Sequence, residues 1–106
     1  MAAKWLDKRF HTRGGGSIRV EVWGHRTTRA VTRYNLAYVN RRISISDNGR
    51  VVGFDNSHVH PGFRSAHHCH WFGRVLENRK FRSFEQTSDR FERPLRWLKR
   101  RHEEEY

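Results

Sequence analysis

The sequence predicts a small α+β domain, in which an antiparallel sheet of four to five strands carries a C-terminal helix on one face. Three observations support this fold class. β-Branched residues alternate with polar ones over residues 17–23, an Asn-Gly pair separates two β-rich segments, and apolar residues recur at helical spacing near the C-terminus. A chain of 106 residues has the length of one domain. We expect the sheet face opposite the helix to be rich in arginine.

Residues 1–16 are expected to form a flexible basic arm, which ends in three consecutive glycines (14–16). The single α+β domain then covers residues 17–106. The triple glycine is not a phosphate-binding loop, because no Lys-Ser or Lys-Thr pair follows it.

Alternation predicts the strands in order along the chain. Residues 17–23 form a strand with Ile18, Val20 and Val22 on one face and Trp23 on the other, where Trp23 is a candidate for stacking on a base. Residues 30–45 form one or two strands, in which Tyr34, Leu36 and Tyr38 share a face. Residues 47–49 (Asp-Asn-Gly) favour a type I′ hairpin turn, in which both central residues take positive φ, and residues 50–54 return as a strand.

The remaining chain is expected to hold a loop, a short strand and a helix. Residues 58–70 form the loop and residues 71–76 the last strand, with Trp71 and Trp97 in the core. Ser83 and Gln86 resemble a capping box at the start of the helix. Phe91, Leu95 and Leu98 recur at helical spacing and form its apolar face. Pro94 should break or kink this helix, or mark the first turn of a second one.

The charge is strongly positive and unevenly distributed. Lys and Arg number 22 against 11 Asp and Glu, and the net charge of +11 lies within residues 1–82. Most of these bases are arginines, whose planar guanidinium groups bind phosphate in a bidentate manner. The composition therefore predicts a polyanion-binding surface, with RNA or another nucleic acid as the first partner and an acidic protein as the alternative. The candidate nucleic-acid-binding residues are Arg33, Arg41, Arg42, Arg50, Arg64, Arg74 and Trp23.

Composition also excludes several classes of protein. No apolar stretch approaches the roughly 20 residues that cross a bilayer, so we expect no membrane partner. Cys69 is the single cysteine, which excludes a disulfide scaffold. The first residues contain no apolar signal segment, and we therefore expect a cytoplasmic protein. No cofactor is indicated, and the alternative of a homodimer stays open.

Histidines form the most distinctive cluster in the sequence. Five of the eight lie between residues 58 and 70. Imidazoles titrate near neutral pH, so two of them placed across a phosphodiester can act as base and acid in metal-independent RNA cleavage. Arg33, Arg64 or Arg74 could balance the charge that develops on the phosphate. The catalytic candidates are His58 and His70 first, then His67, His68 and Asp55.

Two other interpretations of this cluster compete with catalysis. Imidazole nitrogens and one thiolate could bind zinc, although the spacing matches no standard zinc finger. The candidate ligands are His58, His60, His67, Cys69 and His70. Alternatively, the histidines belong to a polar loop and hydrogen-bond only backbone and water.

Two motifs together resemble the TumE-type family of small bacterial toxins. The first is the run of residues 49–58 (GRVVGFDNSH), and the second is the His-His-Cys-His run of residues 67–70. The resemblance covers roughly residues 32–72. This chain has Gly53-Phe54 where the family tends to have Arg-Tyr, and Cys69 where the family tends to have Lys. The resemblance implies a toxin-like protein that acts on RNA and is encoded beside an antitoxin. Together with the histidine cluster it predicts a metal-independent endoribonuclease. The alternatives are a nucleic-acid-binding module without catalysis and a basic protein that binds an acidic partner such as an antitoxin.

Overall fold

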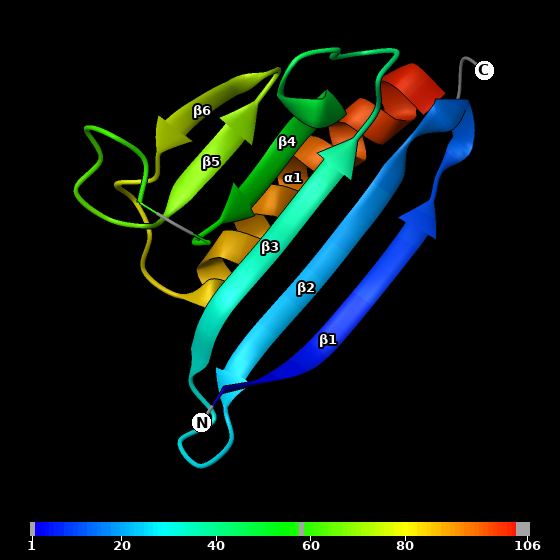
Figure 1. Ribbon diagram of the computed structural model, residues 1–106. Coiled ribbons are helices and arrows are strands. Elements are labelled where there is room, and N and C mark those ends of the chain that lie inside the picture. Colours follow the sequence, from blue (N-terminus) through cyan, green and yellow to red (C-terminus); the bar gives the residue numbers. More distant parts are fainter. Residues whose placement is uncertain (1, 58, 104–106) are drawn as a thin grey trace.

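The computed structural model describes residues 2–57 and 59–103. It contains a six-stranded sheet in which the strands follow chain order and each neighbouring pair is antiparallel, together with a C-terminal helix (Figure 1). The elements are β1 (Ala2–His11), η1 (Arg13–Gly15), β2 (Ser17–His25), β3 (Val31–Val39), η2 (Asp47–Gly49), β4 (Arg50–Asp55), β5 (His68–Trp71), β6 (Arg74–Glu77) and α1 (Phe84–Glu103). The predicted α+β class, antiparallel sheet and C-terminal helix are confirmed.

The predicted strand number of four to five is too low. Residues 2–11 form the edge strand β1, where the sequence predicts an arm instead. Most side chains of β1 are exposed, and several of them are charged. The strand therefore lacks a continuous apolar face. An exposed, charged edge strand of this kind limits pairing with other chains. The tight turn to β2 uses Gly14 and Gly15, whose φ angles of 74° and 81° suit glycine.

The hydrophobic core lies between α1 and one face of the sheet, and Figure 1 shows α1 crossing behind β3 and β4. Alternation places every second residue of the central strands on this face, as predicted for β2 and β3. The buried cluster consists of Tyr34, Leu36, Tyr38, Val51, Val52, Phe54, Phe91, Leu95 and Leu98. The predicted helix stripe at residues 91, 95 and 98 is therefore the face that packs on the sheet.

The two-residue hairpin turn lies at Phe72-Gly73. Trp71 pairs with Arg74, and Phe72 and Gly73 have φ angles of 46° and 84°. The expected turn at residues 47–49 has the predicted positive φ at Asn48 and Gly49 (55° and 81°). It belongs, however, to a longer connection, because β3 ends at Val39 and β4 begins only at Arg50. The predicted strand over residues 71–76 is instead divided between β5 and β6.

The helix begins where the sequence predicts. The Ser83 hydroxyl accepts a hydrogen bond from the Gln86 backbone amide at 3.0 Å, the first half of a capping box. The helix then continues through Pro94 as one element, so the predicted break does not occur. Trp71 and Trp97 are not core residues, since they are 42% and 56% exposed. Within the described residues, no helix combines the length and apolar character needed to cross a membrane.

Candidate functional site

Strand geometry separates the four residues of the His-His-Cys-His run onto two faces. His68 and His70 lie on the sheet face opposite α1 and are buried, whereas Cys69 packs against the core on the helix side. His67 also lies on the helix side, where its ring stacks on Phe81 with a centroid separation of 3.6 Å. Side chains alternate between faces along a strand, so adjacent residues of this run cannot share one site.

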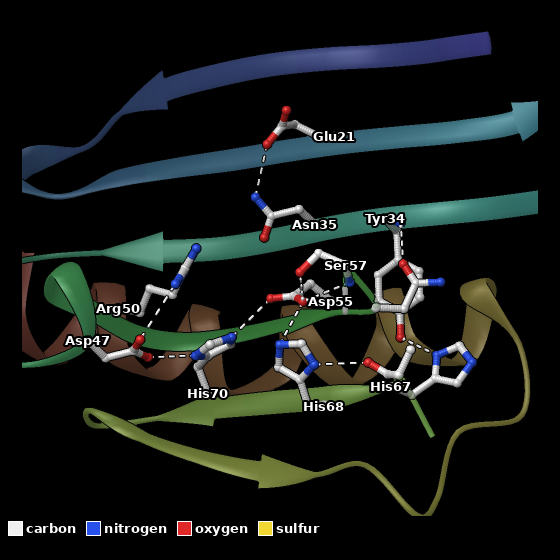
Figure 2. Close-up of polar contacts among 12 residues, drawn as sticks. Glu21, Tyr34, Asn35, Asp47, Arg50, Asp55, Ser57, His67, His68 and His70 are labelled. Carbon is white, nitrogen blue, oxygen red and sulfur yellow. Dashed lines mark hydrogen bonds and ion pairs between the residues drawn. The ribbon is translucent and has the colours of Figure 1, made fainter. Parts of the chain in front are cut away.

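Asp55 joins His68 and His70 into a buried cluster (Figure 2). Asp55 Oδ1 lies 2.7 Å from His68 Nε2, and Asp55 Oδ2 lies 3.0 Å from His70 Nε2. The other ring nitrogens also have partners: His68 Nδ1 is 2.9 Å from the Ala66 carbonyl oxygen, and His70 Nδ1 is 2.5 Å from Asp47 Oδ2. The register brings these residues together, because Asp55 on β4 pairs with His68 on β5.

The contacts within the cluster shift the pKa values of Asp55 and His68 in opposite directions. Burial alone would raise the pKa of Asp55, but hydrogen bonds from His68 and His70 outweigh burial and hold the pKa well below its usual range. Burial lowers the pKa of His68, yet the hydrogen bond to Asp55 and the Ala66 carbonyl raise it above its ordinary value. Asp55 is therefore a carboxylate held by imidazole N–H donors. Ser57 adds two more donors to Asp55 Oδ1, its backbone amide at 3.2 Å and its hydroxyl at 3.0 Å.

The structure thus brings together three of the five predicted catalytic residues. Asp55, His68 and His70 form one cluster, and His67 lies on the other side of the sheet. The fifth candidate, His58, lies outside the described residues. His68 and His70 are only 1% and 4% exposed, and each of their ring nitrogens faces an oxygen of the protein.

His67 lines a separate cavity of about 290 Å³ next to the start of α1. Its Nδ1 lies 2.9 Å from the Tyr34 hydroxyl. Burial and the nearby charge of His68 lower the pKa of His67, while burial and the charge of Asp55 raise the pKa of Tyr34. Both groups are therefore neutral near pH 7. Asn56 closes one side of this cavity and uses its side chain to hydrogen-bond the backbone of β3.

The face of the sheet opposite α1 contains two hollows that share Glu21, Asn35 and Arg50. One has a volume of about 200 Å³ and also includes Trp23, Arg33, Asp55 and Ser57. The other, of about 220 Å³, also includes Arg9, Arg19, Ala37, Val39 and Asn48. We call the two hollows together the open-face groove. Asp55 therefore connects the histidine cluster to this groove.

Some of the charges in the groove are already paired. Arg19 lies 3.1 Å from Asp7 and 3.3 Å from Glu21, and Lys4 bridges the same two acids. Arg33 instead stacks on the Trp23 ring, with its guanidinium carbon 4.6 Å from the ring centroid. Arg33 and Arg9 make no ion pair with any other residue that the structure describes. Their charge remains available to an anionic ligand.

Three of the seven residues that the sequence predicts to bind nucleic acid line this groove together, namely Arg33, Arg50 and Trp23. The other predicted arginines do not line either hollow: Arg41 and Arg42 follow β3, Arg64 precedes β5, and Arg74 opens β6.

Two groove arginines were missed by the sequence analysis. Arg19 could have been found, because it alternates with Ile18 and Val20 on the same face as Trp23. Arg9 could not, because its position depends on the unexpected strand β1.

The predicted zinc ligands do not form one site. His67 and Cys69 lie on the helix side, whereas His70 lies on the open face, and His58 is outside the described residues. The His60 ring packs edge-on against His68, with centroids 4.4 Å apart. Within the described part of the chain, the side chains that converge closely enough for a metal ion are instead those of Asp55, His68 and His70.

Comparisons of the chain with models of protein families, with curated proteins and with solved structures found no match.

Proposed function

We propose that this protein binds single-stranded RNA across the open-face groove. The observation that carries the proposal is the continuity of two hollows lined by Arg9, Arg19, Arg33 and Arg50, with Trp23 at one end. The choice of RNA follows what the resemblance to TumE-type toxins implies. The RNA would lie across the strands, on the side of the sheet opposite α1.

The chemistry of the groove suits a nucleic-acid single strand. Arginine binds phosphate with two parallel N–H donors, and its planar group also stacks on bases. The Arg33–Trp23 stack already presents a flat cationic and aromatic surface of the kind on which bases pack. Asn35 adds an amide, which donates to Glu21 at 3.0 Å and can also bond to a base edge.

The same geometry favours binding over acid–base cleavage. A general base must face the proton that it removes, within hydrogen-bond distance. In His68 and His70 the ring nitrogens face Asp55, Ala66 and Asp47 instead of the groove. A cleavage role for these histidines, the central expectation from the sequence, stays a prediction and requires them to exchange partners when RNA binds.

The test is the affinity of the full chain for a fluorescently labelled single-stranded RNA, measured by anisotropy. Arg33→Gln and Arg9→Gln should each weaken binding about tenfold, because a hydrogen bond to a charged group contributes about 1.5–3 kcal/mol. Arg93→Gln is the matched control, since it removes the same charge from the exposed side of α1. Equal losses in all three variants would show that binding depends only on net charge and would refute the groove. An acidic protein that competes with the RNA for wild type but not for Arg33→Gln would place the expected antitoxin-like partner in this groove as well.

A further inference from the structure

We propose that Asp55, His68 and His70 bind a divalent transition-metal ion such as Zn²⁺. One ligand atom from each of the three residues, a carboxylate oxygen or an imidazole nitrogen, lies within 4.8 Å of the other two. Tetrahedral ligands with zinc bonds of about 2.0–2.1 Å lie roughly 3.4 Å apart, so small rotations of the side chains suffice. Imidazole nitrogen combined with carboxylate oxygen is a donor set that suits zinc and its neighbours in the first transition row.

The outer contacts of these residues support a metal site independently of the ligand spacing. A histidine that binds metal through one nitrogen commonly donates its other N–H to a carboxylate or a backbone carbonyl, which fixes the ring orientation. His68 presents Nδ1 to the Ala66 carbonyl oxygen at 2.9 Å, and His70 presents Nδ1 to Asp47 at 2.5 Å. Both rings consequently direct Nε2 toward the same carboxylate, that of Asp55. Asp47 is itself held by Arg50 at 3.5 Å.

The site can be reached from the groove. Asp55 lines the hollow of about 200 Å³ together with Arg33, Arg50 and Ser57, which gives an ion a path to the cluster. Three protein ligands leave a fourth position for water or for an oxygen of a bound molecule, as in zinc sites that are open to a ligand. A further imidazole, that of His60, lies edge-on to the His68 ring.

Each Nε2 faces an Asp55 oxygen, His68 Nε2 at 2.7 Å and His70 Nε2 at 3.0 Å. A nitrogen that binds a metal ion carries no proton, so any proton on these two atoms passes to solvent when the ion binds. This inference does not rest on RNA binding.

The experiment is a titration of the chelator-treated full chain with Co²⁺, followed by competition with Zn²⁺, in the absence of RNA. We expect one ion per chain and visible absorption bands typical of cobalt with four or five nitrogen and oxygen ligands. His68→Gln and His70→Gln should weaken binding at least about a hundredfold, and Asp47→Asn about 10–100-fold, since it removes only an outer partner. His67→Gln and Cys69→Ser are the matched controls and should leave affinity and spectrum unchanged, because both residues lie on the helix side.

Circular dichroism establishes whether each variant folds. If His68→Gln or His70→Gln fails to fold, Asp47→Asn and the melting temperature of wild type decide the question. Zinc that binds the folded chain should raise this melting temperature as its concentration rises above the dissociation constant. The proposal is overturned if wild type binds no stoichiometric ion, or if His67→Gln or Cys69→Ser removes binding. It is also overturned if folded His68→Gln and His70→Gln bind as tightly as wild type.

Discussion

His70 Nδ1 lies 2.5 Å from Asp47 Oδ2, although the two residues are 23 positions apart in the chain. This contact ties β5 to the connection between β3 and β4, and Asp55 on β4 lies on the other side of the same ring. Asp47 and Asp55 therefore hold the His70 ring between two carboxylates. His68 extends the chain of hydrogen bonds to the loop before β5 through Ala66. The side chains of the cluster thus connect β4, the segment between β3 and β4, and the loop before β5.

Asp55 should be among the most important polar residues for stability. Asp55→Asn removes a buried carboxylate and leaves His68 Nε2 and His70 Nε2 without a charged partner on β4. Removing one partner of a buried ion pair typically costs about 3–5 kcal/mol. Urea unfolding in EDTA should show this loss as a lower midpoint with an unchanged slope. Asp7→Asn, on the exposed edge strand, is the control and should hardly move the midpoint; equal effects would contradict the role assigned to the cluster.

Gly73 lies in the turn between β5 and β6, and Gly62, in the loop before β5, is its matched control. Their φ angles are nearly equal, at 84° and 83°, so alanine brings similar backbone strain of about 1–2 kcal/mol at both positions. A Cβ atom at Gly73 would collide with the Ser46 hydroxyl, whereas a Cβ atom at Gly62 would meet nothing within 4 Å. Gly73→Ala should therefore be less stable than Gly62→Ala by a further 1–3 kcal/mol or so. Thermal unfolding measures the difference, and Ser46→Gly combined with Gly73→Ala should recover most of it.

Alkaline pH should destabilise the protein through Tyr34. Burial, followed by the charge of Asp55, raises the pKa of Tyr34 above its ordinary value of 10.0, so the folded state keeps the proton after the unfolded chain has lost it. The unfolded state then binds fewer protons, and the free energy of unfolding falls as pH rises above about 10, by about 1.4 kcal/mol per pH unit from this group. Tyr34→Phe should remove this part of the slope. The free energy of unfolding of wild type and of Tyr34→Phe should be measured between pH 9 and about 11.5. If the explanation were wrong, it would fall with pH by the same amount in both proteins.

RNA binding should depend on salt in proportion to the arginines that contact phosphate. For single strands, the logarithm of affinity falls with the logarithm of salt concentration by about 0.7 for each phosphate neutralised. Arg33→Gln should therefore make the measured slope shallower by about 0.7. The control Arg93→Gln should leave the slope unchanged, and a slope that Arg33→Gln does not alter would mean that Arg33 contacts no phosphate.

Periodicity in the sequence was enough to predict the central part of the fold. Ile18, Val20 and Val22 on one strand, and Tyr34 and Leu36 on the next, alternate so regularly that burial of one face explains the whole pattern. Edge strand β1 has no such pattern, because most of its side chains are exposed and it is held in the sheet by its pairing with β2. Trp97 was misplaced for a related reason, since aromatic character alone does not reveal which side of an amphipathic helix faces the sheet.

The candidate site was only partly predictable. The sequence indicated that histidines and Asp55 belong together, but a loop was expected where β5 begins, and the alternation of His67 to His70 was therefore overlooked. Asp47 was treated as a turn residue, and its contact with His70 depends on the long connection between β3 and β4. Such contacts depend on strand register, which a single sequence specifies poorly where polar residues occupy the open face.

The most direct test of RNA binding in the open-face groove is an NMR titration of the ¹⁵N-labelled full chain with a short single-stranded RNA. The resonances to follow are the indole N–H of Trp23, the guanidinium Nε–H groups of Arg33 and Arg50, and the backbone amides of β2 and β3. We predict that these signals shift progressively while the amides of α1 remain in place. Shifts confined to α1, with the Trp23 and Arg33 signals unmoved at saturation, would contradict the account.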